Sequence, residues 1–198
     1  MNHDSDIYRI LMRPEETALV IVDHQEAFAS CFEAEAITAI ETGIAALAEA
    51  AGSAGIPIIV SMVETNSIAP GILPSLRDAL RGAAEVKRTG FNPWEEKAFL
   101  SAIKTANRER LVIAGLSSET SLSFTALCGL EEGFDIYVVR DACLGYSEDS
   151  ITMTFSRLTQ AGAVPVSWRQ AVFEWCQGTV EPEQIRKVLK PVTSLPVR

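Results

Sequence analysis

The distribution of hydrophobic positions along the chain predicts alternating strands and helices. Residues 17–22 read Thr-Ala-Leu-Val-Ile-Val, a continuous apolar run that ends at Asp23, and residues 111–116 form another. Runs of this length and composition are typical of strands buried on both faces of a parallel sheet. The strands are expected at residues 17–22, 56–63, 83–88, 110–116, 134–140 and 163–168.

Helical patterns separate these runs. Residues 33–55 are long and alanine-rich, with Gly52 and Gly55 where the helix should end. Asn92-Pro93 stands at the mouth of a later helix, where proline costs no hydrogen bond. The helices are expected at residues 33–55, 74–81, 94–105, 118–132, 149–161 and 181–190.

This alternation predicts an α/β fold: a three-layer α/β/α sandwich with a six-stranded, mostly parallel sheet of Rossmann-like type. The 198 residues suit one domain over 1–198, with an N-terminal tail at 1–14 and a C-terminal extension at 178–198. In such sheets the working groups gather beyond the carboxyl ends of the strands.

Composition narrows the possible partners. The formal net charge of −9 argues against nucleic acid, because phosphate binding requires a basic surface. The first residues are polar, and no stretch approaches the roughly 20 apolar residues that span a bilayer. The four cysteines, which are scattered, suggest free thiols in a reducing cytoplasm. They are Cys31, Cys128, Cys143 and Cys176.

Three chemically capable residues follow predicted strands. Asp23 ends the first strand, Lys87 lies at the end of the third, and Ser121 follows the fourth in a strand-to-helix turn. An acid, a base and a nucleophile in one crevice is the layout of nucleophilic catalysis. Each residue alone also has a structural explanation, as a helix cap, a solvated lysine and a first-turn serine respectively.

Several motifs together resemble the isochorismatase-like cysteine hydrolase superfamily, and most closely its YcaC-like branch. The resemblance covers roughly residues 15–175 and is specific for the superfamily but not for a substrate. The motifs are Asp23-His24-Gln25, the segment 87–94, Ala114-Gly115-Leu116-x-x-Glu119, Phe124-x-Ala126-Leu127, Glu131-Glu132-Gly133-Phe134 and Ala161-Gly162-Ala163-Val164.

The resemblance implies a catalytic set at Asp23, Lys87 and Ser121. It also implies a cis peptide bond at Leu116–Ser117, which would aim the backbone N–H groups of Ser117 and Ser121 into an oxyanion hole. The expected activity is hydrolysis of a small amide or related C–N bond, by a cytoplasmic homo-oligomer that needs no cofactor.

Serine stands where the superfamily has its cysteine, and this departure leaves three alternatives open. A serine needs a strong adjacent base, whereas a thiol ionises readily beside a cation. Ser121 can belong to an enzyme that uses serine, to a silent member that only binds or assembles, or to a chain in which cysteine was replaced. A further alternative is vinyl-ether hydrolysis, which some relatives perform with the aspartate as acid and which would use Asp23 alone.

The walls of the pocket are expected from the residues that follow Asp23 and Lys87. They are Gln25, Phe28, Phe91, Asn92 and Trp94. Aromatic side chains there predict a small, mostly apolar pocket for a small-molecule substrate. Metal binding is not expected, because His3 and His24 are the only histidines, and no glycine-rich phosphate loop implies a nucleotide.

Overall fold

The computed structural model describes residues 11–175, and its six strands form one parallel sheet in the order β3-β2-β1-β4-β5-β6. Every pair of neighbouring strands is parallel. The predicted α/β fold with a six-stranded parallel sheet is therefore confirmed. The strands are β1 (Thr17–Val22), β2 (Ile58–Val63), β3 (Ala84–Arg88), β4 (Arg110–Gly115), β5 (Asp135–Val139) and β6 (Val164–Val166).

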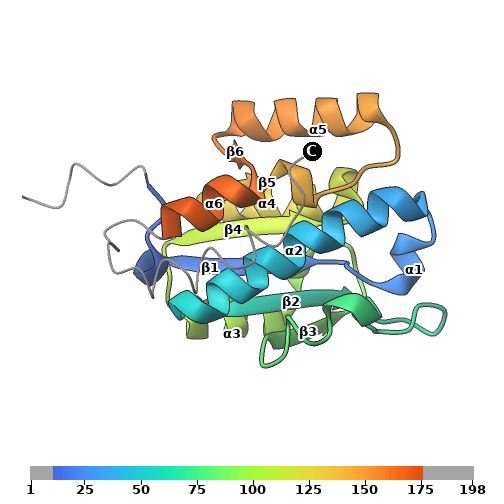
Figure 1. Cartoon of the computed structure of the whole chain (residues 1–198), viewed down its shortest axis with the longest axis horizontal. Helices are drawn as coiled ribbons and strands as arrows, with labels where there is room; N and C mark the ends of the chain where they lie inside the picture. The colour runs from blue at the N-terminus through green and yellow to red at the C-terminus, as the bar shows by residue number, and fades with distance from the viewer. Residues whose placement is uncertain (1–10, 176–198) are drawn as a thin grey trace, which may run out of the picture.

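Helices cover both faces of this sheet (Figure 1). Helices α2 and α6 pack against each other on one face, α3 and α4 lie on the other, and α5 contacts α4 and β6. The helices are α1 (Glu26–Ala29), α2 (Ala34–Ala54), α3 (Lys97–Ala106), α4 (Ser123–Glu131), α5 (Glu148–Ala161) and α6 (Trp168–Trp175). The predicted helix at residues 181–190 lies outside the described residues.

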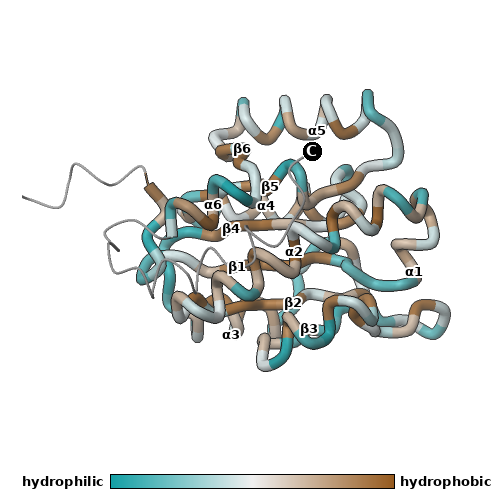
Figure 2. The backbone as a smooth tube through the Cα atoms, in the orientation of Figure 1, coloured by the Kyte–Doolittle hydropathy of each residue, from teal (hydrophilic) through white to brown (hydrophobic). Residues whose placement is uncertain are grey.

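The core follows the strands. All six residues of β1 and all six of β4 are buried, and Figure 2 shows β2 and β4 in the brown of hydrophobic residues. Burial on both faces is the reason that these strands are continuously apolar rather than alternating. No helix among residues 11–175 is long and apolar enough to cross a membrane.

Two predicted helices are interrupted. The helix predicted at 118–132 is a π-helical turn, Ser118–Leu122, followed by α4. The helix predicted at 94–105 is a 3-10 turn, Pro93–Glu95, followed by α3, and the one predicted at 74–81 is reduced to the 3-10 turn Pro74–Leu76. In the last two cases a proline opens a short turn that the chain does not extend directly into an α-helix.

Helix α6 was not expected, because residues 163–168 were assigned to a strand. The strand ends at Val166, and the hydroxyl of Ser167 then accepts a hydrogen bond from Gln170 N at 3.1 Å, which caps the new helix. The buried residues Trp168, Ala171, Val172 and Trp175 lie on one helical face. Both signals are present in the sequence.

The sheet order creates a switch point between β1 and β4. From β1 the chain continues to β2 and β3 on one side, and it then returns to place β4 on the other side of β1. At such a point two loops leave the carboxyl ends of adjacent strands in opposite directions, which opens a crevice between them. Asp23, after β1, and the turn at Ser117–Ser121, after β4, lie at this switch point.

Candidate functional site

Asp23 is the first residue after β1 and is fully buried. Its backbone is left-handed, with φ of 58°, a conformation that aspartate tolerates better than most residues. The backbone N–H of Asp23 donates to Ser61 O at 3.0 Å, which fixes this bend against the end of β2. The carboxyl group is thereby held at the switch point.

Arg88, the last residue of β3, supplies the charge that balances Asp23. Its guanidinium donates to Asp23 Oδ1 in a fully buried ion pair, and its Nε donates to Ser61 Oγ at 3.1 Å. A third hydrogen bond runs from Arg88 Nη1 to Gly90 O at 3.0 Å. The arginine thus reaches across β2 to β1, about 10 Å in strand spacings, with its polar groups satisfied on the way.

Lys87 does not take the place predicted for it. Its side chain is 53% exposed, and its Nζ lies 3.3 Å from Glu64 Oε2. Lys87 is paired with Met62 in the sheet, whereas Arg88 is paired with Val63. Successive side chains of a strand point to opposite faces, so Lys87 faces away from Asp23 and Arg88 faces toward it.

Ser121 lies in the π-helical turn that connects β4 to α4, and it is fully buried. Its hydroxyl is close enough to the Asp23 carboxyl to lower the pKa of that group, although the pair falls short of full hydrogen-bond geometry. Ser121 Oγ and Asp23 Oδ2 have no other hydrogen-bond partner among the described residues. The site therefore holds two buried oxygen atoms, one on each side chain, whose hydrogen-bonding capacity the described residues do not use. π-Helical turns of this kind often occur at functional sites.

The predicted cis peptide bond at Leu116–Ser117 is wrong, because no cis bond occurs within residues 11–175. The chain turns instead through the left-handed backbone of Ser117, with φ of 55° and ψ of 62°. The loop that follows β5 stabilises the turn, since Ser118 N donates to Leu144 O at 2.9 Å.

Burial dominates the electrostatics of Asp23. Loss of solvent raises the pKa of the carboxyl above its ordinary value, while the charge of Arg88 and hydrogen bonding by Ser121 and Arg88 act in the opposite direction. The Asp23 carboxylate is therefore more basic than an exposed one.

The residues predicted to line the pocket are mostly engaged in packing. The Gln25 side chain donates to Val63 O at 2.9 Å and accepts from Val63 N at 2.7 Å, so it extends the end of β2. The indole of Trp94 donates to Thr125 O at 2.9 Å and packs on Phe99 and Phe134.

The other three residues of that set differ in exposure. Phe28 is buried in the core, and Phe91 is 49% exposed. Asn92 accepts from Trp94 N at 3.2 Å and caps the turn at Pro93–Glu95. Phe28 thus contributes to the core, Phe91 to the surface and Asn92 to a turn, and their role as pocket walls stays a prediction.

Within the described part of the chain, neither a thiol nor a metal cluster adds to the site. Cys31, Cys128 and Cys143 are free, and burial raises the pKa of Cys143 to about 12, which keeps it a neutral thiol. Across residues 11–175 no group of three or more His, Cys, Asp or Glu side chains could hold a metal ion.

Comparison with known proteins identifies the family of the chain. The isochorismatase domain matches residues 17–170. A probable hydrolase of Escherichia coli strain K12, YcaC, is 31% identical over 155 residues, which are 77% of this chain and 74% of that protein.

Solved structures of two YcaC proteins share the fold. YcaC from Pseudomonas aeruginosa, determined with hexane-2,5-diol and covalent acrylamide, is 26% identical with a TM-score of 0.83 and 92% coverage of each chain. Escherichia coli YcaC, described as an octameric hydrolase of unknown specificity, is 25% identical with a TM-score of 0.82, covering 92% of this chain and 90% of that one. The chain therefore belongs to the isochorismatase family, among relatives that include the YcaC hydrolases.

Proposed function

We propose that the chain hydrolyses a small amide or related C–N bond, with Ser121 as the nucleophile and Asp23 as the group that moves its proton. The observation that supports this most directly is the buried Ser121 hydroxyl beside the buried Asp23 carboxyl at the switch point of the sheet. Arg88 binds one carboxylate oxygen, Oδ1, and the other, Oδ2, has no hydrogen-bond partner among the described residues.

In this proposal Arg88, and not Lys87, supplies the positive charge beside Asp23. An arginine does not give up its proton at working pH, so the base must be Asp23. In the proposed reaction Ser121 Oγ attacks the amide carbon while Asp23 accepts its proton. Asp23 then returns that proton to the departing nitrogen, and water hydrolyses the acyl-serine ester.

The negative charge that develops on the substrate oxygen requires hydrogen-bond donors. We assign these to the backbone N–H groups of Ser117 and Ser121, which belong to the turn at the start of the π-helical segment. The structure of Pseudomonas aeruginosa YcaC contains covalent acrylamide, which is itself a small amide, and this supports a substrate of that size.

The test is hydrolysis of a panel of small amides by the unchanged protein and by its Ser121→Cys, Ser121→Ala and Asp23→Asn variants. We expect slow turnover by the serine form, because its alcohol is hard to ionise, and at least about tenfold faster turnover by the cysteine form. Ser121→Ala and Asp23→Asn should both abolish it. Turnover that persists in Ser121→Ala would contradict a serine nucleophile.

The raised pKa of Asp23 favours a second candidate, hydrolysis of a vinyl ether. A buried carboxyl that retains its proton can protonate a carbon–carbon double bond without any nucleophilic side chain. In this case activity on a vinyl ether would survive Ser121→Ala and disappear in Asp23→Asn. Tight binding of substrates with no turnover in any form would instead indicate a silent member of the family.

We also propose that the protein is a cytoplasmic homo-oligomer. Support comes from Escherichia coli YcaC, whose structure is described as octameric. Size-exclusion chromatography with light scattering should give a mass that is a multiple of 21.5 kDa, and a monomer across the accessible concentration range would refute the assembly.

A further inference from the structure

Solvent does not reach the oxygen atoms of the proposed reaction. Asp23, Ser117 and Ser121 are all 0% exposed. A substrate can contact Ser121 only after a covering side chain moves, so the residues over the turn control which molecules enter.

The loop that leads into α5 lies over this turn. Ser118 Oγ donates to Leu144 O at 2.7 Å, and Tyr146 N donates to Glu119 Oε1 at 2.8 Å. At Gly145 an added Cβ would lie 2.6 Å from Glu119 Oε1, so the close approach of loop and turn depends on glycine. These contacts fix the backbone of residue 146 above the nucleophile turn.

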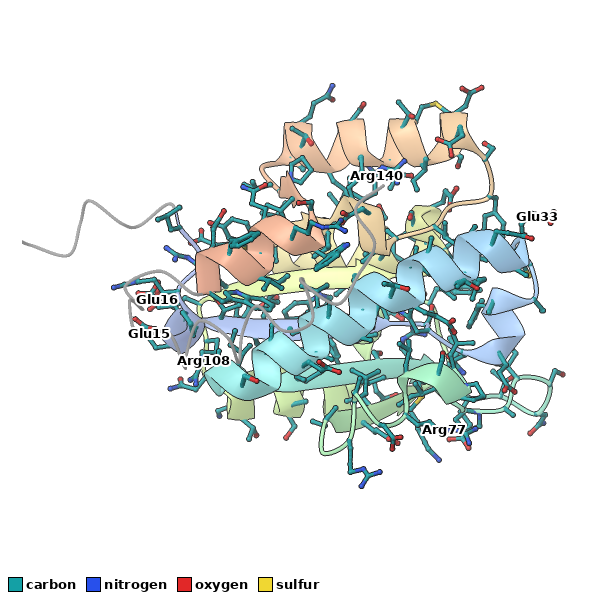
Figure 3. The ribbon with its side chains drawn as sticks, viewed as in Figure 1. Glu15, Glu16, Glu33, Arg77, Arg108 and Arg140 are labelled. Carbon is teal, nitrogen blue, oxygen red and sulfur yellow. The ribbon has the colours of Figure 1, made fainter. Side chains whose placement is uncertain are left out.

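The Tyr146 side chain faces both the site and solvent. It is 58% exposed, and its hydroxyl lies 3.2 Å from Ser117 Oγ in a hydrogen bond. Its ring stacks on Phe32, with centroids 5.6 Å apart and planes 22° apart. Phe32 precedes Glu33, which Figure 3 labels at the end of the molecule where the loop into α5 also runs.

We propose that Tyr146 is a specificity-determining residue that selects substrates carrying a small planar group. The inference rests on the proposed function for the identity of the site and adds a substrate class. The Phe32–Tyr146 stack joins the loop before α2 to the loop before α5, beside the hydrogen bond between Tyr146 and Ser117. A planar substituent that enters between the loops takes the place of Phe32 against the Tyr146 ring.

The chemistry of the stack supports this selection. Aromatic rings attract flat π-systems in offset stacks, whereas a saturated ring of the same size lacks the matching electron distribution. The Tyr146 hydroxyl that leaves Ser117 can donate a hydrogen bond to the substrate in its place. A planar ligand therefore replaces both contacts of the closed form, while a non-planar one replaces one of them.

The experiment measures access by alkylation and does not depend on hydrolysis. In the full-length Ser121→Cys protein, adducts on the introduced thiol are quantified by peptide mass spectrometry with N-phenylacrylamide and with N-cyclohexylacrylamide, which share a reactive group and differ in planarity. Exposed Cys31 in the same sample gives the intrinsic reactivity of each reagent. We expect the phenyl reagent to be favoured at the introduced thiol by about fivefold to tenfold over that reference, the size of one aromatic stack.

Adding Tyr146→Ala should abolish this preference and raise the rate with unsubstituted acrylamide several-fold, because the cover is gone. Tyr146→Phe should retain the preference, since it retains the ring. Phe173→Ala removes an aromatic side chain that is 51% exposed on α6 and should change neither value.

An unchanged phenyl preference in Tyr146→Ala, or no preference in the Ser121→Cys parent, would overturn the inference. If Tyr146→Ala fails to fold, Phe32→Ala in the same background gives the second test, because opening the stack from the other side should also speed acrylamide labelling. Failure of the amide panel with these labelling results intact would reject the proposed reaction and leave the role of Tyr146 standing.

Discussion

Asp23 connects the backbone of the sheet to the chemistry of the crevice. A left-handed residue directly after a buried strand places the carboxyl group beside Arg88 and Ser121. The resulting ion pair is fully enclosed, and an enclosed charge is tolerated only when its partner and hydrogen bonds are in place. Arg88 provides this partner and these hydrogen bonds, so it stabilises the fold as well as taking part in the chemistry of the site.

We predict that Arg88→Leu lowers the free energy of unfolding by about 3–5 kcal/mol, because it leaves Asp23 buried without a partner. Urea denaturation followed by circular dichroism measures the change. The matched control is Lys87→Leu, which removes an exposed pair with Glu64 and should cost less than about 1 kcal/mol. Equal losses of unfolding free energy in the two variants would show that the buried ion pair of Arg88 is worth no more than the exposed pair of Lys87.

The choice between these two basic residues was within reach of the sequence. Val86 is the apolar residue at the centre of a short strand whose neighbours are charged, and it is buried. Period-two alternation places Arg88 on the face of Val86 and Lys87 on the opposite face. The resemblance identified the positions of the aspartate and the serine. Which basic residue faces Asp23, Arg88 or Lys87, depends instead on the alternation of side chains along this short strand.

Helices α2 and α6 pack closely against each other, and this requires a small residue at their contact. At Gly43 an added Cβ would lie 2.9 Å from Cδ1 of the Trp168 ring. Trp168 is nearly fully buried, and its backbone N–H donates to Asp141 Oδ1 at 2.8 Å, so the ring has little freedom to retreat. The glycine therefore sets how closely α6 packs.

We predict that Gly43→Ala destabilises the protein by about 1–2 kcal/mol, because the clash outweighs the helical gain of roughly 1 kcal/mol. Gly52→Ala on the same helix is the control, since nothing lies within 4 Å of its added Cβ. It should stabilise by up to about 1 kcal/mol. Thermal denaturation of both variants gives the comparison, and a stabilised Gly43→Ala would mean that α6 yields.

At the scale of elements the sequence predicted the strands well and the helix interiors less well. Long apolar runs such as β1 and β4 leave little choice, because burial on both faces demands them. The interruption at Ser118–Leu122 depends instead on contacts with Leu144 and the loop after β5, which are distant in sequence. Tertiary contacts of this kind carry no local pattern.

Acid stability is a property of the whole molecule that depends on one buried histidine. His24 is 1% exposed, its Nε2 has no hydrogen-bond partner among the described residues, and burial lowers its pKa to about 4 from the ordinary 6.5. The folded protein thus binds a proton there less readily than the unfolded chain. This contribution is constant above pH 6.5 and is lost as the pH falls from 6.5 to 4.

We predict that the His24→Asn variant loses less stability over this interval, by up to about 3 kcal/mol, because asparagine does not titrate. Urea midpoints between about pH 7 and about pH 4 measure the difference. Asp23, whose pKa is raised, changes stability in the opposite direction and is common to both proteins, so the comparison isolates the histidine. If the urea midpoints of the two proteins fell equally with pH, the folded protein would tolerate His24 in its charged form.

Arg88 lies at the end of an edge strand, and this position affects how the site loses activity when the protein is warmed. Within residues 11–175 β3 pairs with β2 alone, and the outermost strand of a sheet is where fraying begins. When Arg88, the last residue of β3, separates from β2, Asp23 loses its counter-charge while the rest of the sheet remains assembled. On warming, activity should therefore be lost before the fold is lost. A substitution that stabilises the pairing of β3 with β2 would extend the time for which the protein stays active without changing a residue of the site.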